Sequence, residues 1–317
     1  MVIVRDLINS FVEKFSSNSD IKLVIDDVNV GLAYIGVAPA GTATSTASWR
    51  IHRLLEQGDV STIEIASTGM ADQIWDNRAS LFGVPAFTNI NSIQFDGVND
   101  YLAAPHSADL NFERTQTFSF GGWVKFDSVS VQQYIIAKRQ NFGDFRGWLM
   151  DYLNGTGVRI LLHNESNTNR ITVTGPTLLT GTWYHLIATY SGNSLASGIR
   201  LYINSINTAL TVAFNNLTST IQTTVTTQLG GRGDAVFLDG NLDEMAVWNI
   251  ELNQSQINEI YNTGVPIDLS QLSTGANLVS WWRMGDGGTF PTILDNKGTN
   301  HMTMTNMSNS GIVTDVP

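Results

Sequence analysis

Between residues 91 and 264 the chain repeats one pattern, in which short segments of alternating apolar and polar residues are separated by turns rich in glycine and asparagine. In TFSFGGWVKF, at 117–126, Phe118, Phe120 and Phe126 share one face. Alternation with a period of two indicates strands, and many short strands favour an antiparallel sandwich or jelly roll over β-α units. Further strands are predicted at 92–96, 134–139, 147–153, 158–164, 170–173, 183–191, 199–204 and 237–248.

The segments around this series are of three kinds. Residues 1–16 have apolar side chains at helical spacing and predict an amphipathic helix, which either packs on its own domain or docks on a partner subunit. Residues 20–90 contain alternating runs that predict a small β module, followed by a linker from Pro85. We therefore expect three regions: 1–90, a sandwich at 91–264, and an extension with short strands at 265–317.

One helix is predicted near the end of the sandwich, at 252–264. Asn253 and Gln256 have the spacing of a capping box, and Ile257 and Ile260 supply an apolar face. Gly264 is the expected C-terminal stop, because glycine readily adopts the left-handed conformation there.

Composition excludes several classes of function. The net charge of −11 disfavours a nucleic-acid surface and simple electrostatic adhesion to anionic lipid. The chain has no cysteine, which excludes disulfides, thiolate metal sites and cysteine nucleophiles. Charged residues interrupt the apolar run at the N-terminus, so we expect no signal peptide, and no apolar stretch is long enough to cross a membrane.

The ordered strand segments resemble the concanavalin A-like, laminin-G-like jelly-roll family. The resemblance is carried by SIQFDGVNDYL, TFSFGGWVKF, GTWYHLIATYSGN, IRLYIN and LDGNLDEMAVWNIELNQSQINEIYNTG, in this order. It implies a lectin-like sandwich in which the first strand lies close to the last. The turn after IRLYIN departs from the Asp-Gly that is frequent in the family, because it is Asn204-Ser205 here, but these residues also favour turns.

The outer segments resemble a different class of protein. YIGVAPAGTATSTASWRIHRL and QIWDNRASL are similar to modules at the front of phage and prophage virion proteins, and LVSWWRMGDGGTFPTILDN is similar to the end of lectin-like virion proteins of tailed phages. The resemblance implies a capsid decoration or tail component assembled in the host cytoplasm. Its expected partners are other virion proteins, cell-surface glycan and further copies of the chain. A free lectin of cellular origin is the alternative.

An acidic turn interrupts the first strand. Asp96, Asn99 and Asp100 supply hard oxygen ligands of the kind that Ca²⁺ prefers, although Asp and Asn most often cap tight turns through their own backbone. The family resemblance places Asp243 and Glu244 near this turn. Together these five residues form a candidate structural calcium site, with turn capping as the alternative.

Sugar binding, the usual role of the family, depends on an aromatic ring stacked on the sugar and polar groups bound to its hydroxyls. The candidates are Arg146, Trp148, Tyr152 and His163, although a tryptophan in a strand is more often a core residue. The clustered Glu-x-Asp-x-x-Glu strand of related sandwich glucanases is missing, and the histidines lack zinc-ligand spacing. A non-enzymatic protein is therefore predicted.

Overall fold

The computed structural model describes residues 21–29, 32–39, 43, 50–57, 60–65, 87–140, 143–165, 168–233 and 236–317. The chain divides into two compact units, Met1–Phe87 and Thr88–Pro317. The amphipathic helix predicted over 1–16 lies outside the described residues. Among those that are described, no helix is long and apolar enough to cross a membrane.

The first unit contains a four-stranded antiparallel sheet, in which neighbours along the chain are neighbours in space. Its strands are β1 (Ile21–Asn29), β2 (Leu32–Pro39), β3 (Arg50–Gln57) and β4 (Val60–Ile65). The small β module predicted from alternation within residues 20–90 is this sheet.

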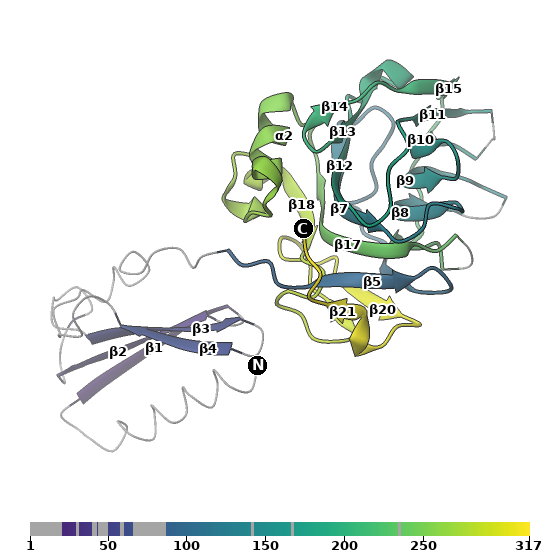
Figure 1. The fold of residues 1–317 in the computed structure, drawn as a ribbon. Coiled ribbons are helices and arrows are strands. Elements are labelled where there is room, and N and C mark those ends of the chain that lie inside the picture. The colour runs from purple at the N-terminus through teal and green to yellow at the C-terminus, as the bar shows by residue number, and fades with distance from the viewer. Residues whose placement is uncertain are drawn as a thin grey trace. The chain divides into compact units, whose positions relative to one another are not determined.

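The second unit is a sandwich of two sheets, with strand pairs that are antiparallel throughout (Figure 1). The nine-stranded sheet has the order β15-β11-β10-β9-β8-β16-β6-β20-β19. Its strands are β6 (Tyr101–Ala104), β8 (Gln133–Arg139), β9 (Gly147–Leu153), β10 (Gly157–His163), β11 (Arg170–Thr174), β15 (Thr211–Asn215), β16 (Thr227–Leu229), β19 (Thr292–Ile293) and β20 (Met302–Thr305).

The eight-stranded sheet has the order β14-β13-β12-β7-β17-β5-β21, with β18 also paired to β17. Its strands are β5 (Ser92–Asp96), β7 (Phe118–Phe126), β12 (Trp183–Tyr190), β13 (Ile199–Ile203), β14 (Ile206–Asn207), β17 (Asp239–Trp248), β18 (Leu278–Trp282) and β21 (Ile312–Val313). The predicted fold class, a mainly β antiparallel sandwich, is confirmed.

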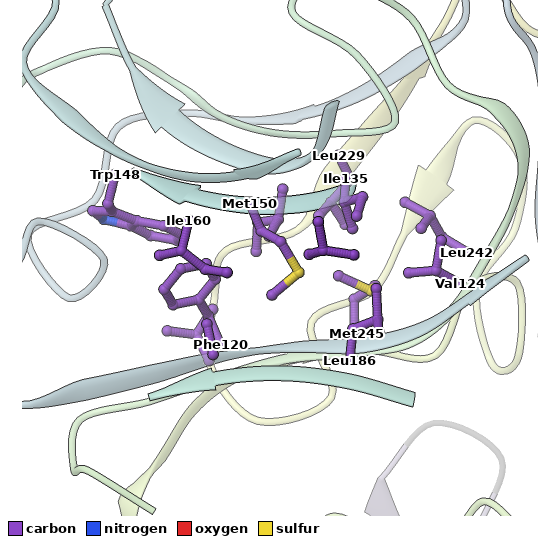
Figure 2. Close-up of a cluster of buried hydrophobic side chains, with 14 of the residues drawn as sticks. Phe120, Val124, Ile135, Trp148, Met150, Ile160, Leu186, Leu229, Leu242 and Met245 are labelled. Atoms are coloured by element: carbon purple, nitrogen blue, oxygen red, sulfur yellow. The ribbon is translucent and has the colours of Figure 1, made fainter. Parts of the chain in front are cut away.

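The core lies between the two sheets, and Figure 2 shows side chains from both meeting there. Phe120, Val124 and Leu186 come from the eight-stranded sheet, while Met150 and Ile160 come from the nine-stranded one. All five are at most 1% exposed. Burying side chains of this size stabilises a fold by roughly 1.5–3 kcal/mol each, which makes the apolar face of each strand the main determinant of the sandwich.

The first strand of the sandwich pairs with the last long strand, as predicted for 92–96 and 241–248. In this register Asp96 lies opposite Asp239, and Ile93 lies opposite Leu242. Beyond Leu242, the strand β17 leaves β5 and pairs with β18 instead. Its pairing with β7 on the other side is interrupted between Asp243 and Ala246, and Glu244 adopts a positive φ of 47° in this bulge.

Residues 265–317 contribute β18, β19, β20 and β21 to the two sheets of the sandwich. The predicted helix forms as α2 (Gln254–Tyr261), and Asn253 and Gln256 make the expected capping box. It ends earlier than predicted, because Asn262 and not Gly264 provides the left-handed C-cap, with φ 44°. A 3₁₀ turn follows at Asn262–Gly264.

Candidate functional site

Two of the predicted sugar-binding residues belong to the core. Trp148 and Tyr152 on β9 are 1% and 2% exposed. The ring of Trp148 lies 4.6 Å from that of Phe120, between the sheets (Figure 2), and its Nε1 donates to the carbonyl of Leu110 at 3.3 Å. The Tyr152 ring packs 5.1 Å from that of Phe126. Their assignment to a sugar-binding surface is wrong, because neither ring can reach a ligand outside the sandwich.

The other two predicted sugar-binding residues are not part of this core. His163, at the end of β10, is buried under the ring of Phe145, which stacks on it at 5.5 Å with an angle of 10°. Arg146 is about one-third exposed and binds the Asp144 carboxylate through Nε at 2.6 Å. The four candidates therefore do not form one surface, because two belong to the core, His163 lies on the outer face of the nine-stranded sheet, and Arg146 lies in the loop before β9.

The outer face of the nine-stranded sheet gathers cationic and aromatic side chains from several strands. Arg139, Gly147, His163 and Arg170 are successive cross-strand neighbours on β8, β9, β10 and β11. Residues in such a row point to the same side of a sheet. We use the name arginine face for Tyr134, Arg139, Phe145, Arg159, His163, Arg170 and Phe214.

A small apolar cluster underlies the arginine face. Tyr134, Ala137, Leu149 and Leu161 form a group that is separate from the main core, and Val236 packs against it. Leu149 and Leu161 are cross-strand partners and alternate with the core-facing residues of their strands. The nine-stranded sheet therefore has apolar residues on both sides, and on the outer side they provide a platform for longer polar side chains.

Arg159 is neutralised within the arginine face. It forms a two-pronged ion pair with Asp151, with Nε–Oδ1 and Nη2–Oδ2 distances of 2.9 and 2.5 Å. Asp151 is fully buried and also accepts a hydrogen bond from Gln132 Nε2 at 2.6 Å. These bonds satisfy both carboxylate oxygens, so Asp151 is a structural anion that holds one arginine in place.

Arg139 binds neutral groups. Its guanidinium donates to the Tyr134 hydroxyl and to Nδ1 of His163, both at 3.2 Å, and lies 4.8 Å from the centre of the Phe145 ring. Gly147 stands between Arg139 and His163 in the row, and a Cβ at this position would lie 1.9 Å from the carbonyl oxygen of Lys138, so glycine permits the close approach of β8 and β9 here. Burial lowers the pKa of Arg139, as do the positive charges of Arg232 and Arg159, whereas Tyr134 raises it.

Arg170 lies on an exposed aromatic ring. Its guanidinium carbon is 3.6 Å from the centre of the Phe214 ring, which is 38% exposed, and its Nε has no hydrogen-bond partner in the part of the chain that the structure describes. Burial lowers the pKa of Arg170, and so do the nearby charges of Arg159 and Arg139. Within the described residues, neither Arg139 nor Arg170 has a carboxylate oxygen within 4.0 Å.

The acidic turn after β5 is held by its own backbone. Oδ1 of Asp96 accepts from the N–H groups of Val98 and Asn99 at 2.8 and 3.3 Å, which is the geometry of a capped Asx turn. Oδ2 of Asp100 accepts from the backbone N–H of Asp96 at 3.3 Å. Burial raises the pKa of Asp100, and the neighbouring Asp96 raises it further. These hydrogen bonds support the turn-capping alternative.

Asp243 and Glu244 belong to a different group, which we call the carboxylate cluster and define as Asp243, Glu244 and Asp286. Glu244 accepts from Nε1 of Trp281 at 2.5 Å and from Nε of Arg283 at 3.2 Å. Asp243 accepts from Asn89 Nδ2 at 2.7 Å. Burial raises the pKa of Glu244 to about 7 and that of Asp243 well above its ordinary value.

The five-residue calcium site predicted from the sequence does not assemble. Asp96 lies opposite Asp239 in the β5–β17 ladder, so Asp243 and Glu244 lie roughly 13 Å or more further along β17 at about 3.3 Å per residue. The described parts of the chain hold no group of three or more acidic or histidine side chains arranged for a metal. That part of the prediction is wrong, and calcium binding by the turn alone stays a prediction.

Sequence analysis missed most of the arginine face. Arg139, Arg159 and Arg170 each occupy a polar position of a strand. A charged side chain is common at such a position and therefore gives no indication of a binding site. A signal was present, because three of the four strands from β8 to β11 carry an arginine in a chain with 17 basic and 28 acidic residues. Finding the face required the register of the four strands, which alternation alone does not define.

Comparison with known proteins identifies the class to which this sandwich belongs. The model of a family described as the concanavalin A-like lectin/glucanases superfamily matches residues 96–258. This match covers more than half of the chain, and the chain belongs to that superfamily. No curated protein matches the sequence.

Three solved structures illustrate the similarity. A putative carbohydrate binding protein from Bacteroides ovatus is 13% identical, covering 98% of this chain and 86% of its own, with a TM-score of 0.51. A heptameric SAP-like pentraxin from Limulus polyphemus is 16% identical, covering 70% of this chain and 98% of its own, with a TM-score of 0.41. The sialidase module CBM40 of Ruminococcus gnavus, bound to α2,3 sialyllactose, is 15% identical, covering 54% of this chain and 97% of its own, with a TM-score of 0.39. At these identities the similarity concerns the fold.

Proposed function

We propose that this protein is a non-enzymatic glycan-binding protein of a tailed-phage particle, and that the arginine face is its binding surface. The observation that carries the binding role is the exposed Phe214 ring under Arg170, on the same face of the sheet as the partly exposed guanidinium of Arg139, which the buried Tyr134 holds in place. Sugars are bound by stacking on aromatic rings and by polar groups that reach their hydroxyls. The arginine face offers both on one side of a rigid sheet, as a lectin-like domain requires.

The carboxylates near the arginine face favour binding over hydrolysis. Glycoside hydrolysis needs two carboxyl groups about 5–9.5 Å apart, one of which must be protonated to act as an acid. Asp151 is fully buried under Arg159 and Gln132. The hydrogen bond from Arg146 holds the pKa of Asp144 below its ordinary value, which is the wrong direction for an acid. Asp144 is therefore not suited to act as the acid, and the burial of Asp151 keeps it from reaching a substrate in either role.

The particle role is supported by the sequence resemblance of the outer segments. We propose that residues 1–90 anchor the protein to capsid or tail proteins and that the sandwich is displayed outward. Displaying a lectin-like domain from an assembled particle would bring many weak glycan sites together, so that avidity could compensate for low affinity at each site.

Binding is tested with the purified chain on an array of bacterial and animal glycans, followed by calorimetric titration of the best ligand. We expect Phe214→Ala to weaken binding about 10-fold or more, as loss of an aromatic stacking surface typically costs 1–3 kcal/mol. Arg200→Met, on β13 of the other sheet, is the matched control. Absence of binding to every glycan, or binding that Phe214→Ala leaves unchanged, would contradict this role for the arginine face.

Anchoring is tested separately in a phage that encodes the protein. Deletion of residues 1–90 should leave a folded sandwich that is missing from purified particles. Incorporation of the truncated protein at normal copy number would place the anchor elsewhere. Absence of the full-length chain from particles would instead overturn the virion role without bearing on glycan binding.

A further inference from the structure

The arginine face has the opposite charge balance from the rest of the chain. The protein carries a net charge of −11, yet Arg139, Arg159 and Arg170 gather on this face, and of the three only Arg159 forms an ion pair within the described residues, with Asp151. The charge of Arg159 affects the pKa of both Arg139 and Arg170, and that of Arg139 affects the pKa of Arg170. Grouping like charges costs free energy, so an excess that persists in a folded surface requires a compensating interaction.

The compensation is incomplete for two of the three arginines. Of the three arginines, Asp151 binds Arg159 and neither of the others within the described residues. Arg139 donates to a phenol and an imidazole, and Arg170 rests on a benzene ring. Within the described residues the Nε atoms of Arg139 and Arg170 have no hydrogen-bond partner, but they are buried, so an anion would have to be bound by the Nη groups. A guanidinium has four N–H donors on its two Nη atoms, in a planar fork that matches a carboxylate or sulfate, and Arg139 uses only two of them in its bonds to the phenol and the imidazole.

We infer that the arginine face selects acidic glycans, with Arg170 and Arg139 receiving the carboxylate or sulfate groups of the sugar. This inference rests on the proposed glycan-binding function and names the class of ligand. Phe214 supplies the apolar surface for the sugar ring beside Arg170, and the hydrogen bond to His163 holds Arg139 in place. An anion bound here would gain charge-assisted hydrogen bonds in a partly desolvated setting, where they are stronger than on an open surface.

The two arginines have separate parts in this arrangement. Arg170 lies beside an exposed ring and is the more accessible cation, whereas Arg139 is held by three neighbours and has little freedom left to lose on binding. A preorganised donor loses less conformational entropy when a ligand binds. We therefore assign Arg139 to orientation and selectivity, and Arg170 to capture of the anionic group.

The experiment uses ligand pairs that differ in charge alone. Calorimetric titrations compare 3′-sialyllactose and 3′-sulfated lactose with lactose, and tri-galacturonic acid with its methyl ester. The full chain is used at low and at high sodium chloride. We expect the acidic member of at least one pair to bind about 10-fold or more tightly than its neutral partner, and this preference to shrink with salt. The carboxylate and sulfate arms show which anion is preferred.

Variants then assign the effect to the arginine face. Arg170→Met and Arg139→Met should each weaken binding of the acidic ligand by about 10- to 100-fold, in line with a lost hydrogen bond between charged groups. Both should leave the affinity for the neutral ligand almost unchanged. Arg170→Lys should retain part of the preference because it keeps the charge but loses the fork. Arg200→Met is the control, and melting curves verify that each variant is folded.

Each outcome is decisive. Equal binding of acidic and neutral partners overturns the inference but leaves the glycan-binding function intact. A preference for acidic ligands that survives both methionine variants also overturns it, because the site would then lie elsewhere. Absence of binding by any glycan, here and on the array, rejects the proposed function itself.

Discussion

The arginine face and the carboxylate cluster both hold an excess of one charge, but they resolve it differently. In the carboxylate cluster, Asp243, Glu244 and Asp286 are at most 7% exposed, and the cation Arg283 pairs with two of them, Glu244 and Asp286. Every carboxylate oxygen there accepts a hydrogen bond from the protein. In the arginine face, two of three cations lack an anionic partner among the described residues and lie toward the solvent side of the sheet.

The difference separates a structural role from a binding role. Charges that are buried and fully bonded hold chain segments together, since Asn89, Ile90 and Asn91 before β5 are tied to Asp243 and Asp286. Charges that are partly exposed and incompletely bonded are available to a ligand. The two regions are distinguished by the exposure of their charged groups and by the number of hydrogen-bond partners that each group has, and not by charge alone.

The largest effect is expected from removing the cation of the carboxylate cluster. Arg283→Met leaves Glu244 and Asp286 buried without their ion-pair partner, which typically costs about 3–5 kcal/mol. The free energy of unfolding in urea measures this. Arg200→Met breaks a more exposed pair with Glu251 and should cost less than about 1 kcal/mol. Equal losses in the free energy of unfolding for the two variants would contradict the expectation that the buried ion pairs contribute more to stability than the exposed one.

A second effect concerns pH. Burial raises the pKa of Glu244 to about 7, above its ordinary value of 4.5, so the folded state binds this proton more tightly than the unfolded state. The stabilisation is therefore fully present below about pH 4.5 and is lost as the pH rises toward 7. Relative to Glu244→Gln, the native protein should lose about 3 kcal/mol of stability between these limits.

This second prediction is measured by urea unfolding of both proteins at intervals between pH 4.5 and 7.5. The free energy of unfolding of the native protein minus that of Glu244→Gln should decrease with rising pH and become constant above about pH 7. A difference that grows over this range would mean that the pair with Arg283 dominates and that the glutamate is ionised throughout.

Substitutions in the arginine face should have little effect on stability. Arg170→Met removes a cation that makes no ion pair within the described residues and lies near two like charges. We expect a change in the free energy of unfolding within about 0.5 kcal/mol of zero. Thermal and urea denaturation measure it. A loss comparable with that of Arg283→Met would show that the arginine face holds the sheet together and would weaken its assignment to ligand binding.

The smallest effect is expected from removal of calcium. Asp96 already accepts two backbone hydrogen bonds and Asp100 one, so the acidic turn has internal compensation. We expect a chelator to shift the melting temperature by less than about 1 °C. A larger decrease that calcium reverses, and that Asp100→Ala abolishes, would establish a metal site in the turn.

Much of the fold could be predicted because alternation is a local property. The strands at 118–126 and 147–153 and the capping box of α2 follow from residues adjacent in the chain. The Asn204-Ser205 turn also behaves as expected, with φ values of 49° and 66° in the β13–β14 hairpin. These features depend on side-chain type and spacing, which the sequence contains.

The candidate site could not be predicted because it depends on register and on which face is the inner one. Alternation places Trp148 and Tyr152 on one side of β9, but Leu149 on the other side is also apolar and equally buried. Similarly, family resemblance brings the first and last strands together without stating that Asp96 meets Asp239 and not Asp243. A shift of four residues along an antiparallel pair keeps the same face and changes the partner.

The pairing of β5 has a consequence for how this chain acquires its structure. Its two partners, β17 and β21, are both synthesised long after it, and the side chain of Ser92 is hydrogen-bonded to a residue 223 positions further along. The first strand of the sandwich must therefore remain unpaired during most of translation. Contacts of such long range make folding slow and leave strand edges open to association with other chains. We therefore expect pairing of β5 with β17 and β21 to compete kinetically with aggregation of nascent chains.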